Sequence, residues 1–591
     1  MPGGTLNIEA AGESNIILNG NPKKSFFKAT YAKYRNFGMQ KFRLDFEGSK
    51  QLQLTEDTTF KFKIPRYADL LTDTYFVVKI PSIWSPIGIP ESSVSLNIND
   101  ISQCQPYEFK WIENLGTQLI RSARVLINGQ VIQEFTGQYL NCMMQRDFTK
   151  EKRDLYDEMT GNTKELNDPA NYNNRNGNYP NASYMKLNRN SWTNGVEPSI
   201  RGRNLYIPIN IWFTLLSTSA LPLVSLQYSE VEIEITCRPI KELFVVRDVR
   251  QYMKNRGNPD RQCDYIPYVS PDDTSDFFNF YYFLYEPPEN TWGITGTNYD
   301  TINNYYPNKR YDWNADIHLI STYVYLDNLQ VKEFALNKQC YLIKEVHEQK
   351  YYNIIAKKEY LQTIDTIGLV SSWMWYFQRS DVNLRNEWSN YNNWDYNYLP
   401  YPCTSYLDIS NNKTSYPDPY RQPNIPQCPE SGQVCGLYLT GPQHIENEKN
   451  IMTSWGLLLD GEVRETRLEQ GTVNYMEKYF RSNGNLESGV YSYNFCIDTD
   501  PFNYQPSGAI NLSKFDNIGF EFTTIEPPDV SGDVFVSTLC NNLSEGEIGP
   551  EIITRKPYWT DYKYSYNLHI MEERYNILTI ENGVGNLALA R

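Results

Sequence analysis

Side chains that could carry out catalysis are sparse and widely separated in this chain. The four histidines are His318, His347, His444 and His569, and no two of them are close in the sequence. A metal centre inside a β barrel needs clustered imidazoles with a nearby carboxylate, so the spacing predicts no metal site. The metalloprotease, serine-nucleophile and phosphate-loop motifs are also absent. We therefore predict a protein that is not an enzyme and that uses no cofactor.

Asp498 and Asp500 form a short acidic motif that could in principle bind a cation. Calcium takes six to eight oxygen ligands, and two carboxylates separated by one threonine supply only part of such a set. We interpret this stretch as a solvated loop tip.

The ten cysteines are scattered along the chain and include no CxxC pair, which argues against a zinc site. We interpret most of them as reduced thiols in the core or in loops. Cys428 and Cys435, which lie in a proline-rich stretch, are the pair for which a disulfide stays open.

Four Asn-x-Ser/Thr sequons are present, at Asn181, Asn412, Asn511 and Asn542. Chance alone produces several sequons in a chain this rich in asparagine. The first residues have neither a basic start nor an apolar run, so no secretory signal is predicted. Glycosylation at Asn181, Asn412 or Asn542 is possible in principle but is not expected.

The composition favours β structure and argues against nucleic-acid binding. Aromatic residues make up 14% of the chain, with 47 tyrosines, and such side chains suit a pleated, half-buried surface. The formal net charge of −15 is the wrong sign for broad phosphate contact. The most apolar long stretch, residues 210–226, is interrupted by serine, threonine and proline, so no membrane-spanning helix is predicted.

Alternation of apolar and polar residues marks several strands. It is clear at residues 42–48, 60–65, 223–237 and 517–525, where a period of two predicts a sheet with one buried face. Helical periodicity is rare, and residues 137–148 form the one short candidate.

Two stretches match each other and suggest an internal duplication. "VLINGQVIQEF" begins at Val125 and "LLLDGEVRETR" begins at Leu457. Asn128-Gly129 and Asp460-Gly461 each fit the centre of a type I′ hairpin, which needs positive φ at both residues. Such turns are common in β proteins, so coincidence is the competing explanation. However, each copy is followed by a long segment that ends in an alternating strand, and this favours two related β domains.

The beginning of the chain carries a basic and aromatic arm. Residues 19–42 hold six basic and six aromatic residues and no acid. Asn21 and Pro22 are typical of a helix start, and Phe27, Tyr31 and Tyr34 would then share one helical face. This arm could be a plain first element of the fold, a nucleic-acid arm, a membrane-surface helix or a docking segment for a protein.

Several motifs resemble the major capsid proteins of the large nucleocytoplasmic DNA viruses, of the mimivirus and algal-virus type. In the first half they are Gly20-Asn21-Pro22, Phe26-Phe27-Lys28, Asn36-Phe37, "YADLLTDTYFVVKIP" from Tyr67, "WIENLGTQLIRSARVLINGQVIQEFTGQYL" from Trp111 and "LPLVSLQYSEVEIEI" from Leu221. In the second half they are "YVYLDNLQVKEFA" from Tyr323, "YQPSGAINLSKFDNIGFEF" from Tyr504 and "YNILTIENGVGNLALA" from Tyr575. The resemblance spans essentially the whole chain.

This resemblance implies an all-β fold of two tandem eight-stranded antiparallel jelly rolls with long loop insertions and short helices. We expect an arm at residues 1–40, a first jelly roll at 41–240, a connecting region at 241–312 and a second jelly roll at 313–591. The Tyr- and Asn-rich segments at residues 162–194, 252–314 and 375–427 are expected to be ordered loops on the outward-facing top.

The resemblance also implies a structural role in a virion. Three chains would form a homotrimer, a pseudo-hexameric capsomer that tiles an icosahedral capsid assembled in the host cytoplasm, in the viral factory. Minor capsid proteins, and an internal membrane, are the other implied partners, and no direct contact with nucleic acid is expected. The alternatives are a minor double jelly-roll paralogue and a carbohydrate-binding or carbohydrate-active jelly-roll protein.

In this family the chain start lies at the base of the capsomer, so the arm is predicted to dock there on neighbouring capsomers or minor capsid proteins. The residues assigned to docking are Asn21, Pro22, Lys24, Phe26, Phe27, Lys28, Tyr31, Tyr34 and Arg35.

Overall fold

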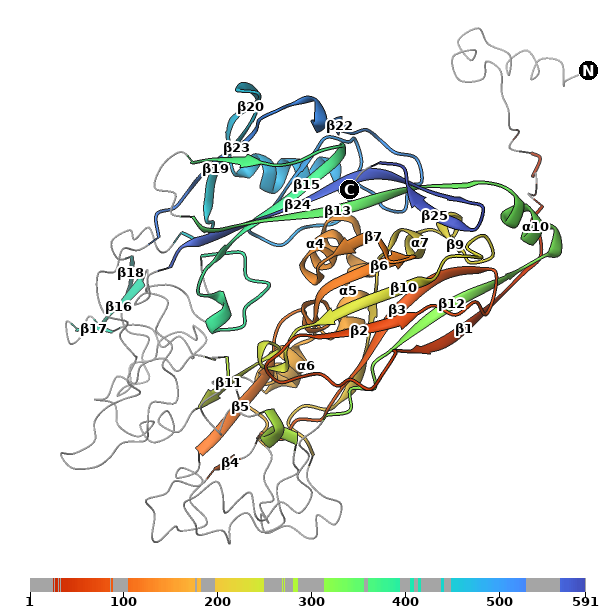
Figure 1. The fold of residues 1–591 in the computed structure, drawn as a ribbon. Helices are drawn as coiled ribbons and strands as arrows, with labels where there is room; N and C mark the ends of the chain where they lie inside the picture. Colours follow the sequence, from red (N-terminus) through yellow and green to blue (C-terminus); the bar gives the residue numbers. More distant parts are fainter. Residues whose placement is uncertain are drawn as a thin grey trace, which may run out of the picture.

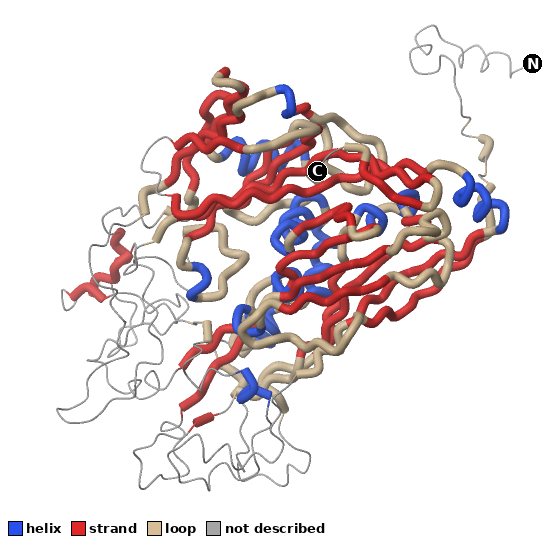
Figure 2. The backbone as a smooth tube through the Cα atoms, in the orientation of Figure 1, coloured by secondary structure: helices blue, strands red, loops and turns tan. Residues whose placement is uncertain are grey.

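The computed structural model is built mainly from antiparallel strands, with short helices gathered between two strand-rich halves (Figure 2). It describes residues 25, 27–29, 31, 33–85, 87–88, 105–175, 178–181, 197–248, 268, 270–271, 280–284, 313–354, 360–393, 404–408, 413–415, 437–440, 448–527 and 564–589. This arrangement matches the all-β class expected from the aromatic composition.

The first half consists of two facing sheets. One follows the order β1-β12-β3-β8, with β9 added beside β3, and the other follows β2-β10-β6-β7. The strands are β1 (Phe37–Asp45), β2 (Thr58–Lys63), β3 (Leu70–Ile80), β6 (Ile120–Ile127), β7 (Gln130–Phe135), β8 (Arg203–Pro208), β9 (Leu221–Pro222), β10 (Val231–Cys237) and β12 (His318–Leu326). In β10 every second residue is buried, as its alternating sequence requires.

The second half repeats this plan. Its sheets follow β13-β24-β15-β21 and β14-β23-β19-β20, with β22 and β25 added beside β15 and β24. The strands are β13 (Gln339–Ile354), β14 (Tyr360–Ile364), β15 (Leu369–Arg379), β19 (Met452–Leu459), β20 (Glu462–Glu469), β21 (Val490–Asn494), β22 (Ile510–Asn511), β23 (Ile518–Thr524), β24 (Tyr566–Glu581) and β25 (Val584–Leu587). The same order along the chain in both halves is the double jelly roll that the resemblance implies.

Two smaller sheets and several short helices are added to these four sheets. Two further sheets follow the orders β11-β5-β4 and β17-β16-β18, from β4 (Ile87–Gly88), β5 (Gln105–Trp111), β11 (Phe244–Asp248), β16 (Thr404–Asp408), β17 (Lys413–Ser415) and β18 (Leu437–Thr440). The helices are α3 (Leu115–Leu119), α4 (Gly137–Asp147), α5 (Lys150–Thr160), α6 (Lys164–Asn167), α7 (Trp212–Leu215), α10 (Asn328–Leu336) and α11 (Glu477–Arg481), with short 3-10 turns elsewhere. Within the described residues, none of these helices is long and apolar enough to cross a membrane.

Both predicted hairpins are confirmed. Asn128 and Gly129 have φ of 54° and 76° between β6 and β7, and Asp460 and Gly461 have φ of 51° and 84° between β19 and β20. Each turn occupies the same place in its own half, which agrees with the two related β domains expected from the sequence.

The boundary between the halves differs from the expected one. β12 lies in the range assigned to the second jelly roll, yet it pairs with β1 and β3 in the first. β1 in turn begins at Phe37, within the expected arm. The sheet order therefore places the change from one roll to the other at α10. Sequence reasoning missed this because pairing between strands so far apart leaves no local signal.

Most of the 223–237 stretch that reads as one strand is not a strand. Only β10, its last part, is extended in a sheet, and residues 223–230 turn back toward the second half. Likewise Trp375, at the start of an expected long loop, lies in β15 and is fully buried.

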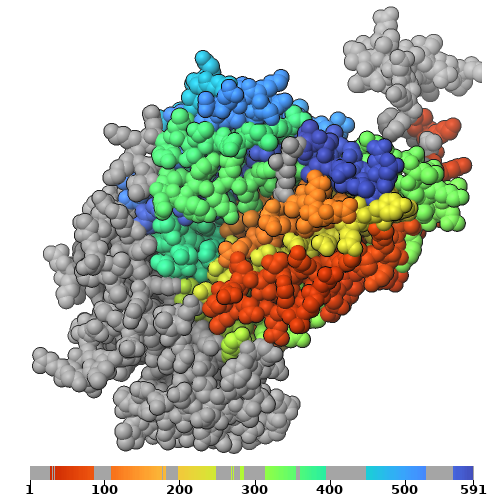
Figure 3. Space-filling model, in the orientation of Figure 1, coloured from red at the N-terminus to blue at the C-terminus, as the bar shows by residue number. Residues whose placement is uncertain are grey.

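The hydrophobic core is continuous between the halves. A single cluster includes Leu140 of α4 together with Tyr341, Met374 and Met571 of the second half. A separate cluster around Trp373 and Phe520 fills the space between the two sheets of the second half. The β13-β24-β15 sheet is thus covered on both faces, which explains why β15 is buried almost throughout instead of at every second residue. Figure 3 shows the two halves packed against each other.

Candidate assembly site

Two features could serve assembly: the arm at the start of the chain and the junction that holds the rolls together. Several of the predicted arm residues, Asn21, Pro22, Lys24 and Phe26, lie outside the described residues. Phe27, Tyr31 and Tyr34 are described, and their side chains are 100%, 89% and 84% exposed. No helix forms among the described residues between 25 and 36, so the shared helical face predicted there is wrong. A helix this short is marginal in water unless one face is buried.

Arg35 is the anchor between the arm and the body. Its guanidinium makes two hydrogen bonds, of 2.7 and 3.0 Å, to the carboxylate of Glu333 on α10. α10 has no buried residue, and it lies near the start of β1 (Figure 1). The bidentate geometry orients the arm, although an exposed ion pair contributes little stability.

Helix α4 lies at the junction and packs between the two jelly rolls. All of its residues are buried, because it leaves β7 of the first roll and packs under the β13-β24-β15 sheet of the second. Thr136 caps its start by accepting a hydrogen bond from the Tyr139 amide at 3.2 Å. Gly137 is required there, since a Cβ would lie 1.8 Å from the Thr117 carbonyl oxygen. This is the helix that the sequence predicted at residues 137–148.

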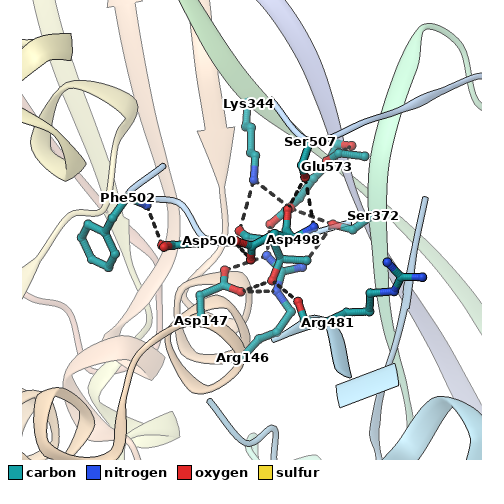
Figure 4. Close-up of polar contacts among 12 residues, drawn as sticks. Arg146, Asp147, Lys344, Ser372, Arg481, Asp498, Asp500, Phe502, Ser507 and Glu573 are labelled. Carbon is teal, nitrogen blue, oxygen red and sulfur yellow. Dashed lines mark hydrogen bonds and ion pairs between the residues drawn. The ribbon is translucent and has the colours of Figure 1, made fainter. Parts of the chain in front are cut away.

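A buried charge network ties the end of α4 to the second roll (Figure 4). Arg146 donates to Asp147 in its own helix, to Glu573 of β24 at 2.7 Å and to Ser372 of β15 at 3.1 Å. Tyr139 also donates to Glu573, at 2.8 Å. Burial alone would raise the pKa of Glu573, but Arg146 and Lys344 outweigh it and lower the pKa to about 2. The network therefore holds an ionised carboxylate in the interior.

Two further polar side chains of α4 also bond across the junction. Gln138 donates to the Trp388 carbonyl at 2.6 Å and accepts from the Tyr391 hydroxyl at 2.6 Å. Gln145 accepts from the Glu487 amide at 2.9 Å and donates to the Glu487 carboxylate at 3.3 Å. These directional bonds fix how one roll sits on the other, which apolar packing alone would not do.

Glu113 marks a second polar region of the junction. Burial, then the nearby charge of Glu487, raises the pKa of Glu113 to about 7, while Lys110 opposes this shift. A carboxyl with a raised pKa binds its proton in the folded chain at a pH where the unfolded chain has lost it. Its contribution is therefore fully present below about pH 4.5 and is lost as the pH rises through about 7.

The Glu113→Gln variant should consequently be more stable than the wild type at pH 8.5 and closely similar to it at pH 4. The expected gain at pH 8.5 is about 1–3 kcal/mol, because glutamine removes a charge that burial disfavours. Urea denaturation at both pH values measures it, with Glu158→Gln on the exposed side of α5 as the control. An equal difference at the two pH values would contradict this assignment.

No catalytic constellation forms within the described residues. His318 and His347 lie in different sheets, and His569 stacks on Tyr376 inside the core, where burial lowers its pKa to about 3. Asp498 and Asp500 accept hydrogen bonds from amides of their own loop, at 3.0 and 2.9 Å. No group of three metal-ligating side chains is found in this part of the chain. His444 lies outside it.

Some of the predicted cysteine and glycosylation sites lie within the described residues, and others lie outside them. Cys142, Cys237, Cys340 and Cys496 are free thiols, whereas Cys428 and Cys435 lie outside the described residues. Among the sequons, Asn181 is described and accessible only in part, and Asn412 and Asn542 are not described.

Comparison with known proteins agrees with the architecture. The family described as "Major capsid protein N-terminus" matches residues 25–284. This segment is similar to the N-terminal region of major capsid proteins. The match begins in the arm and runs through the first hairpin and α4, so the helix at the junction lies inside the matched part, whereas its partners in the second roll lie outside it.

Relatives and solved structures extend this capsid-protein likeness. The major capsid protein of Chrysochromulina ericina virus is 28% identical over 44% of this chain and 45% of its own length, and that of Phaeocystis pouchetii virus is 29% identical over 41% and 42%. The alignments thus span less than half of each relative. The Faustovirus major capsid protein covers 97% of this chain with a TM-score of 0.54 at 12% identity, and the capsid of the PBCV-1 virus covers 96% at 0.53 and 16%. These structures share the fold.

Sequence reasoning missed the most constrained polar residues of this capsid-type fold. Arg146, Asp147 and Glu573 were not selected, although an Arg-Asp pair inside an apolar helix is an available signal, because charged residues are almost never fully buried unless paired. It also missed the turn at Asn582-Gly583, which has φ of 54° and 83° and joins β24 to β25.

Proposed function

We propose that this chain is the major structural subunit of an icosahedral viral capsid. The match of residues 25–284 to capsid proteins, on a chain folded as two joined jelly rolls, is the observation that supports this most strongly. In this proposal three copies form a pseudo-hexameric capsomer with six jelly rolls. The role is mechanical and needs no reactive group, so the protein is not an enzyme.

The junction suits such a role physically. A capsid subunit must keep its shape, because the shell is held together by many modest contacts between neighbouring subunits. Here α4 and the Arg146 network fix the two rolls in one orientation with bonds that are shielded from water. A trimer of such rigid pairs presents six similar lobes at nearly equal angles, which is the geometry of a six-neighbour lattice position.

Electron microscopy of the purified protein tests this proposal. The expected particle is three-fold, with a hexagonal outline and a native mass of three chains of 69.1 kDa. A monomeric globule at micromolar concentration would overturn the proposal, and so would a minor copy number in purified virions, which would favour a minor capsid paralogue.

The arm is the part that we assign to partners on the inner face of the shell. Phe27, Tyr31 and Tyr34 bury nothing in the isolated chain, and exposed aromatic groups beside lysines are suited to docking on neighbouring capsomers or minor capsid proteins. The positive charge would also suit an anionic membrane beneath the shell.

Removing residues 1–34 should leave a stable trimer that does not tile. The truncation spares β1, so the melting temperature should change by no more than a few degrees, whereas shell formation should be lost. Thermal unfolding and electron microscopy of assembly reactions measure the two effects, with Arg35→Ala as a milder variant that removes only the anchor to Glu333. Normal shells from the truncated chain would show that the arm does not dock.

A further inference from the structure

A short helical segment of the second roll carries a ridge of exposed apolar side chains. It consists of a single π-helical turn, η11 (Thr472–Met476), followed directly by α11, between β20 and β21. Tyr475, Met476, Tyr479 and Phe480 project from it, and we call these four residues the aromatic ridge. Tyr479 and Phe480 are 91% and 75% exposed. Soluble proteins rarely leave such a group of large apolar side chains in water without a partner.

A hollow of about 560 Å³ adjoins the ridge. The same segment forms one wall, through Thr472, Val473, Glu477 and Arg481. Trp455, Tyr493 and Phe495 form a row of rings on the other side, with centroids 4.8 and 5.1 Å apart. The exposed ridge and one wall of the aromatic-lined hollow thus belong to the same short helical segment.

Two buried polar atoms at the hollow have no partner in the described part of the chain. They are the indole nitrogen of Trp455 and the side-chain oxygen of Asn494, and both residues line the hollow and are more than nine-tenths buried. Buried donors and acceptors are nearly always satisfied in native proteins. These two atoms are among several buried polar atoms of the described residues that have no partner, so they show that the hollow has a partly polar lining and do not by themselves indicate a ligand.

The charges around this face identify the occupant. Glu462, Arg464, Glu465, Arg467 and Glu469 alternate along β20, and Glu477 and Arg481 flank the hollow, so acids and bases are nearly balanced. The whole chain carries −15, and two copies would repel each other over most of their surfaces. A nearly neutral, mixed-charge face is where they can meet, and it offers no excess of positive charge to phosphate or lipid head groups.

We propose that the aromatic ridge and its hollow form a self-complementary contact in which a second copy of this chain docks about a two-fold axis. Each copy inserts its aromatic ridge into the hollow of the other. A two-fold axis makes both insertions equivalent, because each copy carries the ridge and one wall of the hollow on the same segment. The proposal rests on the proposed capsid function and deepens it, because a two-fold contact joins neighbouring trimers and lies outside the three-fold contact within a trimer.

The double variant Tyr479→Ser/Phe480→Ser tests this contact. Both side chains are exposed, so the fold and the trimer should be retained, while the concentration needed for trimers to associate should rise at least about tenfold. Leu361→Ser, an exposed leucine of β14 on the opposite edge of the same sheet, is the matched control and should leave association unchanged. Sedimentation velocity reports trimers and larger species separately.

A complementation experiment tests the reciprocal arrangement. Ala509 lines the hollow, so Ala509→Trp should plug it while leaving the ridge intact. A mixture of the plugged variant and the ridge variant should associate better than either alone, because one intact ridge can still enter one intact hollow.

The outcomes separate this inference from the proposed function. Wild-type protein that forms no trimers would overturn the proposed function itself. If the ridge variant no longer forms trimers, the ridge lies in the three-fold contact and the two-fold proposal is overturned. If the trimers of the ridge variant associate as strongly as those of the wild type, the two-fold proposal is also overturned. Failure of the mixture to exceed both variants would overturn the reciprocal geometry.

Discussion

Replacing Arg146 with methionine is expected to lower the free energy of unfolding by about 3–5 kcal/mol. Methionine fills a similar volume, so the loss does not arise from a cavity. It arises because Asp147 and Glu573 would stay buried without the cation that now bonds to both of them. Removing one partner of a buried charge network is far more damaging than removing an exposed pair. Urea denaturation followed by tryptophan fluorescence measures the loss.

Arg43→Met is the matched control for this prediction. Arg43 also bridges two acids, Asp45 and Asp316, but all three side chains are more than two-fifths exposed. The control should therefore cost less than about 1 kcal/mol. The triple variant Arg146→Met/Asp147→Asn/Glu573→Gln should recover part of the loss, because no net charge then remains buried. Equal losses in Arg146→Met and Arg43→Met would mean that water reaches the network.

Gly484→Ala is expected to separate the rolls locally and to cost at least about 3 kcal/mol. A Cβ at this position would lie 2.2 Å from the carbonyl oxygen of Gln145 and 2.7 Å from that of Phe148. Both atoms belong to the backbone at the end of α4, so they cannot rotate away as a side chain would. The Gly484 amide also donates to the Arg146 carbonyl at 2.7 Å, and the shift would weaken this bond.

Gly471→Ala provides the comparison on the same connection between β20 and β21. A Cβ there would approach nothing closer than 3.6 Å, and the backbone is already helical at φ −59°. The change should stay within about 0.5 kcal/mol of the wild type. If Gly484→Ala were equally mild, then the close approach of the two rolls at this point would not be a rigid feature of the protein in solution.

The local features of this fold were predictable from the sequence because each has a local cause. Asn128-Gly129 and Asp460-Gly461 require positive φ, and that preference acts between adjacent residues. The alternation in β10 and β23 follows from one buried face, and helix α4 follows from its apolar period. The repeat of the hairpins was enough to indicate two related domains.

The features that were missed depend on partners far away in the chain. Arg146 and Glu573 are separated by 427 positions, and no pattern in either neighbourhood identifies the other. β12 reads as a strand, but its sheet is set by register with β1 and β3. The arm reads as a helix because its residues have a helical period, yet without a buried face that period stabilises nothing.

The position of β12 has a consequence for how the chain is made. Among the described residues β1 pairs only with β12, and Phe37 lies opposite Leu326, so this strand has no sheet neighbour there until β12 has been synthesised. Glu573, the second acid that bonds to Arg146, is synthesised later still, 427 positions after it. A growing chain therefore carries β1 unpaired until β12 emerges, and Arg146 has only Asp147 as its acidic partner in this network until Glu573 emerges. Products that end before β12 cannot close the first roll, and this restricts assembly to chains that include β12.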